Sequence, residues 1–435
     1  MVEIWYDFRL MTGAVSGLVV IPVLLVLLLF VLFLGIHRHM SKSRCVYLVD
    51  FSCLMPSSTL RVPSAHFVEH ISLINHFDKL SIQFMTKALS SSGMGEETCL
   101  PPSLHYLPPN VHFRESLKEA RMLFFPVLDE LFAKTKVSPD DVNILIVNCS
   151  GFCPCPSLTS IVVNHYKMRE DIKTFNISGM GCSASGIGVD VVRNLLKVHP
   201  NSYAVILSTE ILSTGWYGGK DRRMLLLNCM FRMGSAAILL TNRREWRRRS
   251  KYKLVHLFRT HHADKDGAYN ALMRKEDSHG ITGFSIHREV LKEIRENIKS
   301  HIIVFGALIL PLHEKLRYLF YQFMNAMESK SLSTTKMDKY NYVPRFGSAI
   351  QHYCIPGSSL SIIKEIGKGL ALTGWDMDPS LQIFRRFGNQ SSASMWYQMA
   401  YMESNGRVMK GDKIWHFGTG SGMKCYSSVW ESNSG

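Results

Sequence analysis

The sequence contains neither a disulfide framework nor a complete metal-binding motif. Its ten cysteines are spread over 435 residues, too thinly for a small disulfide scaffold. The tightest group, Cys149, Cys153 and Cys155 in "NCSGFCPCPS", lacks a second cluster that would complete a tetrahedral zinc site. We therefore interpret the cysteines as reduced, mostly buried thiols, and we expect no bound metal.

The basic motif with interleaved aromatic residues that marks nucleic-acid-binding domains is also absent. Lys and Arg nevertheless number 50 against 35 Asp and Glu, which gives a formal net charge of +15. Such an excess favours contact with an anion, either anionic lipid or a phosphate-bearing cofactor. We expect no nucleic-acid partner.

Charge is missing altogether from residues 11–36, which read "MTGAVSGLVVIPVLLVLLLFVLFLGI" and are long enough to span a bilayer. A cleaved signal peptide would have a shorter apolar region with positive charge before it. Here Glu3 and Asp7 precede the run, whereas Arg38 and Lys42 follow it. By the positive-inside rule, we predict an uncleaved transmembrane anchor with the bulk of the chain in the cytosol.

Beyond the anchor, short apolar runs predict strands at 142–148, 172–178 and 202–209. The last two enclose "SASGIGVDVVRNLLKVH", whose apolar residues recur at helical spacing. A strand, a Gly-rich turn, a helix and a strand in succession predict an α/β fold.

The same unit recurs at an offset of 209 residues. The segment "FNISGMGCSAS" (175–185) lies over "FRRFGNQSSAS" (384–394), and the strand at 203–209 falls on 412–418. The repeat predicts two homologous halves, 45–245 and 246–435, after an anchor region at 1–44. The basic segment 242–253 between them is either a solvated connection or a contact for lipid headgroups or cofactor phosphates.

Several long motifs carry a resemblance to a known family: "NHYKMREDIKTFNISGMGCSAS", "NCMFRMGSAAILLTNR", "RTHHADKD", "RRFGNQSSASMWYQMAYME" and "GSGMKCYSSVWE". From about residue 45 to the C-terminus the sequence resembles plant 3-ketoacyl-CoA synthases, of the thiolase-like group that includes chalcone synthase. The resemblance implies a thiolase-like α/β fold, in which two duplicated halves form five αβαβα layers. It also implies a protein that is usually dimeric and is anchored in the endoplasmic reticulum membrane.

The resemblance gives Cys182, in "SGMGCSASGIG", the role of the nucleophile that takes the acyl chain as a thioester. A turn at a helix N-terminus favours the thiolate, so we expect Cys182 to be ionised. The alternative is a packing cysteine in a tight corner. Asn389, in "RFGN", matches the asparagine that stabilises the enolate of malonyl-CoA, or is a turn residue.

The histidine that assists decarboxylation in the family is missing. The family segment resembles "HFCIHAGG", whereas residues 352–359 read "HYCIPGSS", so Pro356 occupies the position of that histidine. A second family histidine is replaced by Arg385, which either reaches the enolate or points outward. His261 and His352 match family histidines, although His352 is equally well interpreted as structural.

Supporting roles are expected near the C-terminus. Gly420 and Gly422 belong to "GTGSG", a glycine-rich loop that approaches the active site and the pantetheine arm in this fold. Lys424 either meets a CoA phosphate or is a solvated lysine. The segment 301–312 and the basic amphipathic stretch after it form either core or dimer packing, or a membrane-facing entrance for acyl chains.

Two functions follow from the resemblance. The first is an acyltransferase of very-long-chain fatty acid elongation, which condenses a long-chain acyl-CoA with malonyl-CoA to 3-ketoacyl-CoA, carbon dioxide and CoA. The second is an impaired homologue that binds acyl-CoA or pairs with active synthases as a regulator. The expected partners are these CoA thioesters, a second copy or a related synthase, and other elongase subunits. We expect no further cofactor.

Overall fold

The computed structural model describes residues 45–287, 289–328 and 342–433. By compactness the chain divides after Cys45, and Val46–Gly435 form one unit. The predicted anchor at 11–36 lies outside the described residues. Among the described helices, none is sufficiently long and apolar to cross a membrane.

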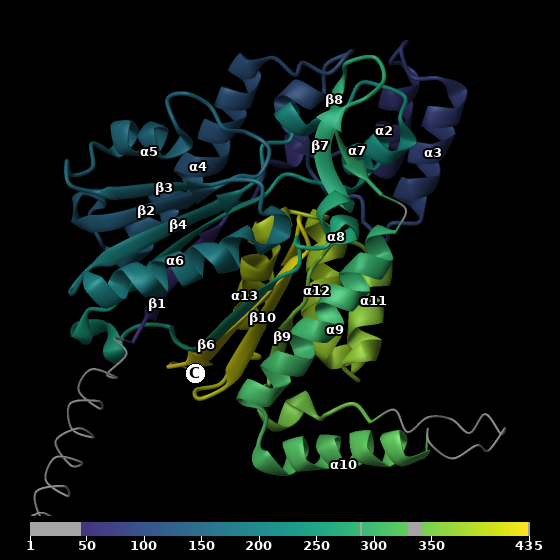
Figure 1. Cartoon of the computed structure of the whole chain (residues 1–435). Helices are drawn as coiled ribbons and strands as arrows, with labels where there is room; N and C mark the ends of the chain where they lie inside the picture. The colour runs from purple at the N-terminus through teal and green to yellow at the C-terminus, as the bar shows by residue number, and fades with distance from the viewer. Residues whose placement is uncertain (1–44, 288, 329–341, 434–435) are drawn as a thin grey trace, which may run out of the picture. The chain divides into compact units, whose positions relative to one another are not determined.

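A mixed sheet of nine strands, in the order β3-β2-β4-β5-β1-β6-β11-β10-β9, forms the centre of this unit (Figure 1). Its strands are β1 (Tyr47–Cys53), β2 (Val142–Asn148), β3 (Lys173–Ile177), β4 (Tyr203–Thr209), β5 (Ser235–Thr241), β6 (Tyr252–His261), β9 (His352–Cys354), β10 (Lys413–Gly420) and β11 (Lys424–Ser432). A separate hairpin consists of β7 (Leu272–Glu276) and β8 (Thr282–Ile286).

The sheet consists of two groups of strands with the same internal pattern. β4 runs parallel to β2 and antiparallel to β5, and β10 runs parallel to β9 and antiparallel to β11. β1 then flanks β5, as β6 flanks β11. The groups join where Tyr47 and Leu48 pair with Lys253 and Tyr252. Corresponding strands of the two groups therefore occupy corresponding places in the sheet.

Helices cover the two groups and also lie between them (Figure 1). The helices are α2 (Ser64–Ser72), α3 (Lys79–Ser90), α4 (Phe113–Thr135), α5 (Leu158–Tyr166), α6 (Ala184–Val198), α7 (Arg222–Met230), α8 (Asp266–Asn270), α9 (Val290–Ile309), α10 (Leu312–Glu328), α11 (Leu360–Gly369), α12 (Gly374–Phe387) and α13 (Ser394–Ser404). α4 packs on β1 and β5, and α9 packs on β6 and β11. α6 and α13 each contact strands of both groups, which makes them the central helical layer.

Close packing in that layer depends on glycine. Tyr426 of β11 lies between Gly186 of α6 and Gly418 of β10, and a Cβ at either glycine would come within 2.0 Å of its ring. Trp396 of α13 donates its indole N–H to Ser185 Oγ of α6 at 2.7 Å. The start of α6, which directly follows the turn with the predicted nucleophile, is thus held by β11 and α13.

The 209-residue repeat holds for the central elements and fails at one edge. β4 and α6 recur as β10 and α13 at the predicted positions. β3, however, falls at this offset on α12, so the match of Phe175 with Phe384 joins a strand to a helix. α12 begins with a capping box between Thr373 and Asp376, a local helix signal that β3 lacks.

Candidate active site

Cys182 lies in a short 3-10 turn, η4 (Gly181–Ser183), that leads directly into α6. Gly181 has a φ of 56°, a left-handed conformation that favours glycine. Its N–H donates to Ser150 Oγ at 2.9 Å, which ties the cysteine loop (residues 178–183) to the segment after β2. Cys182 as a whole residue remains partly exposed.

The surroundings of Cys182 favour the thiol over the thiolate. Burial is the main cause that raises its pKa from 9.0 to about 11, and the Glu210 carboxylate adds to the rise. A hydrogen bond with Ser391 opposes it only in part. The prediction of an ionised Cys182 is therefore wrong for the resting site.

The asparagine loop (residues 388–393) faces the cysteine loop, because its 3-10 turn η8 (Ser391–Ala393) contacts η4. Asn389 is buried, and its Oδ1 accepts the Ser391 N–H at 2.8 Å. Ser391 lies 209 residues after Cys182, and its side chain opposes the rise in the pKa of that thiol. The structure thus brings the predicted nucleophile and the predicted asparagine into one site.

The asparagine loop is held in place by Arg232, a buried residue. The Arg232 N–H donates to the Asn389 carbonyl at 2.9 Å, and the guanidinium donates to Thr98 Oγ1 at 3.1 Å. Gly388, with a φ of 72°, packs so closely that a Cβ there would come within 2.6 Å of Arg232. These contacts determine where the backbone of Asn389 lies.

Glu210 completes the polar part of the site. It follows the last residue of β4, and its Oε2 accepts the Ser150 N–H at 2.7 Å. Its Oε1 accepts the Ser391 hydroxyl at 3.3 Å, and Cys149 Sγ lies 3.7 Å from Oε2. Burial raises the pKa of Glu210, although these hydrogen bonds oppose the rise.

His352 is not part of this site. Its Nε2 lies 2.9 Å from Asp412 Oδ2, and the imidazole is nearly buried beside the first residues of β10. The cysteine loop instead meets the other end of β10, where Gly420 contacts Met180. Six residues of strand separate the two ends, about 20 Å at the rise of a β-strand. The structural interpretation of His352 therefore replaces the predicted catalytic one.

Pro356 does lie at the edge of the sheet where the site forms. Cys354 of β9 is level with His416 of β10, so residue 356 follows at about the level of Gly418. Ile355 is held by Gln398 of α13, which accepts its N–H at 2.9 Å and donates to its carbonyl at 2.8 Å. Pro356 is buried there and offers no hydrogen-bond donor.

Arg385 points outward, which is one of the two orientations predicted for its side chain. It is exposed on α12 and lines a surface cavity of about 650 Å³ together with Glu96, Glu97 and Arg386. Its carbonyl accepts the Gly95 N–H at 2.7 Å. Cys182 does not line this cavity, so the guanidinium is no substitute for the missing histidine.

The "GTGSG" loop packs directly on the cysteine loop. A Cβ at Gly420 would lie 2.1 Å from the Met180 carbonyl and 2.4 Å from Ser183 Oγ. Ser421 Oγ donates to the Gly179 carbonyl at 2.9 Å. This contact gives Gly420 a packing role at the site, whereas its predicted role in binding CoA stays a prediction.

Lys424 is buried, so its interpretation as a solvated lysine is wrong. Its ammonium contacts Met180 Sδ at 3.4 Å, and burial lowers its pKa. Gly422, with a φ of 66°, turns the chain beside this ammonium. His261 pairs with Lys424 across β6 and β11 and is exposed. Its Nδ1 accepts the Ala263 N–H at 3.3 Å, and its catalytic role stays a prediction.

All ten cysteines are free, but only half of them are buried, and Cys153 and Cys155 are exposed. The expectation of mostly buried thiols is therefore wrong for two members of the tightest cysteine group. In the described part of the chain, no group of three or more His, Cys, Asp or Glu side chains could hold a metal ion.

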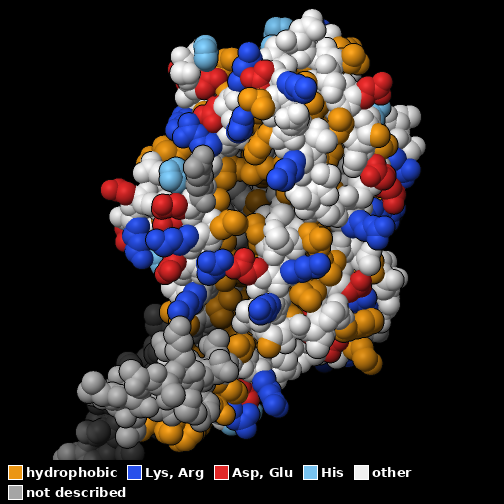
Figure 2. Space-filling model, turned by 90° about the vertical axis from the view of Figure 1, so that its right-hand side faces the viewer, with side chains coloured by type: hydrophobic (Ala, Val, Ile, Leu, Met, Phe, Trp, Pro, Cys, Tyr) orange, Lys and Arg blue, Asp and Glu red, His pale blue; other side chains and the backbone are white. Residues whose placement is uncertain are grey.

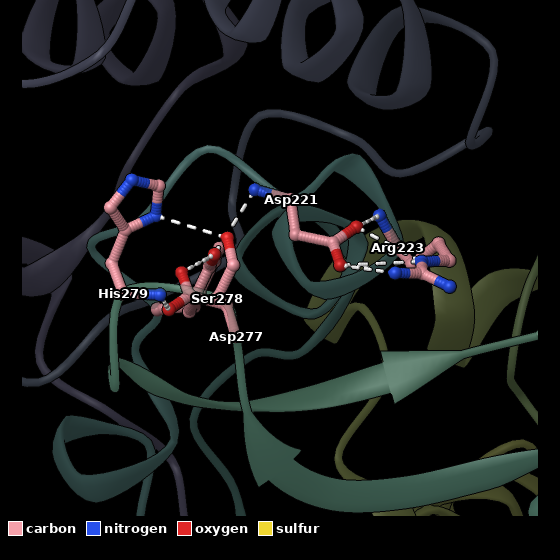
Figure 3. Close-up of polar contacts among 6 residues, drawn as sticks. Asp221, Arg223, Asp277, Ser278 and His279 are labelled. Atoms are coloured by element: carbon pink, nitrogen blue, oxygen red, sulfur yellow. Dashed lines mark hydrogen bonds and ion pairs between the residues drawn. The ribbon is translucent and has the colours of Figure 1, made fainter.

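A second polar cluster lies at the turn between β7 and β8 (Figure 3). Asp277 Oδ1 accepts the N–H groups of His279 and Ile281 at 2.8 and 2.9 Å, and its Oδ2 accepts the Tyr217 hydroxyl at 2.5 Å. Asp221 pairs with Arg223 beside a cavity of about 390 Å³. These contacts anchor the hairpin, and Cys182 does not line the cavity.

Sequence reasoning missed Glu210, Ser391 and Ser150. Two signals were available for them. Ser391 is the residue that the 209-residue repeat places over Cys182. Glu210 is the first charged side chain after a fully buried strand, and such positions face the edge of an α/β sheet where sites form.

Comparisons with known proteins agree with this geometry. The family described as "FAE1/Type III polyketide synthase-like protein" matches residues 38–327, and "3-Oxoacyl-[acyl-carrier-protein (ACP)] synthase III C terminal" matches residues 347–432. The fold resembles a fungal type III polyketide synthase, ORAS, with a TM-score of 0.67 at 12% identity over 89% of this chain and 99% of that one. A type III polyketide synthase from Streptomyces coelicolor gives a TM-score of 0.65 at 14% identity, over 89% of this chain and all of the other (100%). The fold and the site therefore define a thiolase-like α/β protein.

Sequence similarity places the chain more narrowly. It is 45% identical to 3-ketoacyl-CoA synthase 5 of Arabidopsis thaliana, over 93% of this chain and 80% of the relative. Identity to 3-ketoacyl-CoA synthase 6 of the same plant is also 45%, over the same shares of both chains. The chain belongs to the 3-ketoacyl-CoA synthase family.

Proposed function

We propose that this chain is an acyltransferase that loads a long-chain acyl group from acyl-CoA onto Cys182 and condenses it with malonyl-CoA to a 3-ketoacyl-CoA. The observation that carries the proposal is the meeting of the partly exposed Cys182 with the loop of Asn389. Family membership supports the substrates, and the reaction needs no cofactor beyond the two CoA thioesters.

Each half of the reaction uses a different part of the site. The Cys182 sulfur attacks the acyl-CoA carbonyl and forms the acyl-enzyme thioester. Malonyl-CoA then loses carbon dioxide, and the amide of Asn389 donates a hydrogen bond to the enolate oxygen. The buried ammonium of Lys424 supports binding of an anionic group of the CoA substrates next to the cysteine loop.

A second candidate function is favoured by Pro356. The position that should provide a donor for decarboxylation is a buried proline, while His352 is paired with Asp412 and Arg385 is exposed. In this alternative the chain accepts an acyl group but condenses poorly, and acts as an acyl-CoA-binding regulator that pairs with active synthases.

One assay separates the two functions. The full-length protein is mixed with labelled acyl-CoA and malonyl-CoA, and acyl-Cys182 and 3-ketoacyl product are measured separately. We expect acylation with slow condensation. Pro356→His should raise the condensation rate by about 10²–10³, the usual effect of one oxyanion donor, and leave acylation unchanged. Arg385→His is the matched control, since it restores a family histidine at an exposed position and should give no gain.

Fast condensation by the unchanged chain would reject the regulatory alternative. If acyl-Cys182 forms without 3-ketoacyl product, and Pro356→His restores the product, the regulatory alternative is supported. No acylation of the folded protein would overturn both functions.

We further propose that residues 11–36 anchor the protein in the endoplasmic reticulum membrane with the site in the cytosol, and that it forms dimers with itself or with related synthases and joins other elongase subunits. Support comes from the apolar run and the basic residues that follow it. Figure 2 also shows one face on which lysine and arginine side chains surround a hollow with hydrophobic side chains. Such a surface suits anionic headgroups and CoA phosphates.

A further inference from the structure

The basic segment 242–253 has no part in the proposed reaction, yet its contacts make it a well-fixed turn. Trp246 donates its indole N–H to the Tyr203 hydroxyl at 2.7 Å and packs against the hydrophobic core. The buried Ser250 donates its N–H to the Trp246 carbonyl at 3.0 Å, and its Oγ accepts the Asn433 side-chain N–H at 2.8 Å. The segment is therefore more than a solvated connection between the two halves.

Most of the charge of this segment lies in residues 243–249, the arginine turn, which contain five arginines and one glutamate. Glu245 lies 3.8 Å from Arg243 and accepts the Tyr203 hydroxyl at 3.4 Å. The other four arginines are exposed: Arg244, Arg247, Arg248 and Arg249. The first three of these form no hydrogen bond or ion pair within the residues that the structure describes. Several unpaired guanidinium groups on one fixed turn favour an anionic ligand.

The arginine turn lies next to the first residues of β1. Tyr47 pairs with Thr241 at the end of β5 and with Lys253 near the start of β6, and the turn connects these two strands. The Leu254 N–H donates to the Val46 carbonyl at 2.9 Å. Figure 1 shows that β1 and β6 both begin at the lower edge of the sheet. The chain thus enters the folded unit beside the arginines.

This edge of the sheet is opposite the edge at which the candidate active site lies. β4 begins here, because its first residue, Tyr203, also pairs with Thr241. Its last residue, Thr209, precedes Glu210 of the site, and seven residues of strand are about 20 Å long. A bound CoA substrate must place its thioester at Cys182, so its phosphates are poor candidates for the ligand of the arginine turn. Lipid phosphates are the better candidates.

The length of chain before β1 keeps this edge of the sheet near a membrane. Eight residues, 37–44, separate the proposed anchor at 11–36 from Cys45. Even when fully extended, eight residues reach only about 30 Å. The arginine turn of an anchored protein therefore stays close to the bilayer surface, where anionic lipids of the cytosolic leaflet attract cations.

We propose that the arginine turn binds the phosphate groups of anionic lipids in the membrane that holds the anchor, and thereby determines which edge of the sheet faces the bilayer. This inference rests on the proposed anchor at 11–36. A guanidinium group matches phosphate oxygens with two parallel N–H bonds. Each arginine at an anionic surface strengthens binding by about fivefold, so three unpaired arginines favour this orientation by about 100-fold.

The test measures by mass spectrometry how fast each arginine reacts with phenylglyoxal, which modifies guanidinium groups. Full-length protein is placed in nanodiscs of phosphatidylcholine, either alone or with about 30% phosphatidylserine. We expect Arg247 and Arg248 to react at least about fivefold more slowly in the anionic nanodiscs. Salt at about 1 M should remove most of this difference, because it shortens the Debye length to about 3 Å.

Arg114 and Arg121 of α4 are the matched control within the same molecule. Both are exposed, and the helix between them lies near the opposite edge of the sheet, since Ser116 Oγ is 3.0 Å from Ser213 Oγ beyond the end of β4. Their reaction rates should be equal in the two kinds of nanodisc.

A pair of double variants tests whether the arginines bind lipid together. Replacing Arg247 and Arg248 by glutamine weakens binding of the turn, so Arg244 should react at least about fivefold faster in anionic nanodiscs. Replacing Arg114 and Arg121 by glutamine removes the same charge elsewhere and should leave the rate of Arg244 unchanged.

Equal reaction of Arg247 and Arg248 in both kinds of nanodisc would overturn the role of the arginine turn, while the anchor stands as long as alkaline extraction leaves the protein with the lipid. Release of the protein by alkaline extraction would overturn the anchor, and this inference would fall with it. If free CoA protects the arginines in phosphatidylcholine nanodiscs as strongly as phosphatidylserine does, the turn binds CoA phosphates and the assignment to lipid is wrong.

Discussion

At Cys182 the start of a helix and the burial of the thiol act on the pKa in opposite directions. A helix N-terminus stabilises an anion by about 0.3–1 kcal/mol. A rise of the pKa from 9.0 to about 11 corresponds to about 3 kcal/mol, so burial and the nearby carboxylate outweigh the helix. The turn before α6 can be predicted from the sequence. The burial of the thiol and the effect of the Glu210 carboxylate on its pKa cannot. That is why the sequence predicts the nucleophile and misjudges its ionisation.

A second buried carboxylate makes stability depend on pH. Glu119 of α4 accepts the N–H groups of Leu212 and Ser213 at 2.6 and 2.9 Å, and burial raises its pKa from 4.5 to about 7. The folded state therefore holds the proton more tightly than the unfolded state. The free energy of unfolding should fall by at most about 3 kcal/mol as the pH rises from about 4.5 to about 7.

Thermal unfolding of the full-length protein between about pH 5 and about pH 8 checks this prediction. Glu119→Gln should remove most of the decline in the melting temperature across this interval. Glu130→Gln, at an exposed position of the same helix, is the control and should retain the decline. Equal pH dependence in both variants would contradict the assignment to Glu119.

At the scale of elements, the β10–β11 hairpin positions the cysteine loop through a contact that tolerates no side chain. Gly420→Ala would place a Cβ 2.1 Å from the Met180 carbonyl, so the hairpin or the cysteine loop must shift. Overpacking of this kind costs about 1–3 kcal/mol. We expect a lower melting temperature and a loss of acyl-Cys182 formation of about tenfold or more.

Gly374→Ala is the matched control for Gly420→Ala, since nothing lies within 4 Å of a Cβ at residue 374 and its backbone is not left-handed. This variant should keep both the melting temperature and the acylation rate. If Gly420→Ala behaves like the control, the hairpin does not position the nucleophile.

The elements that are best predicted from the sequence are those marked by a local pattern of residues. The strand at 142–148 and the apolar run before Glu210 match β2 and β4, because each is a short apolar run bounded by polar residues. The repeat also places α13 and β10 correctly. The repeat fails at β3, because the segment 209 residues later is the helix α12 and not a strand. Shared residue types such as Phe175 and Phe384 do not distinguish a strand from a helix, whereas the capping box at the start of α12 does.

At the scale of the whole molecule, the predicted site residues separate according to which end of a strand they occupy. The sequence correctly predicts that the loops of Cys182 and Asn389 meet, because the repeat relates these loops. His352 carries the same kind of family match, yet its distance from the site depends on the register of β9 against β10. That register is set by contacts between residues far apart in the chain, and the pairing of His352 with Asp412 is one of them. Motif matching alone cannot show it.

One surface of the molecule bears on its proposed place at a membrane. α10 exposes five large apolar side chains on one face: Leu312, Leu316, Leu319, Phe320 and Phe323 are each at least 57% exposed. Its polar residues include Lys315 and Arg317, and Glu314 holds the helix by accepting the Arg345 N–H at 3.1 Å. An exposed apolar stripe beside basic residues is typical of helices that lie in the lipid interface. Among the two interpretations of this region, the stripe favours the membrane-facing one.

Hydrogen exchange of the full-length protein in vesicles with anionic lipid tests this placement. Replacing Leu316 and Leu319 by glutamine keeps helix propensity but removes two apolar contacts with lipid, each worth about 1.5–3 kcal/mol. The α10 amides should then exchange at least about tenfold faster than in the unchanged protein. Leu73→Gln with Leu80→Gln is the matched control, because both leucines are 58% exposed outside α10. Since the anchor is intact in every variant, equal exchange of α10 in all of them would mean that lipid does not cover this helix.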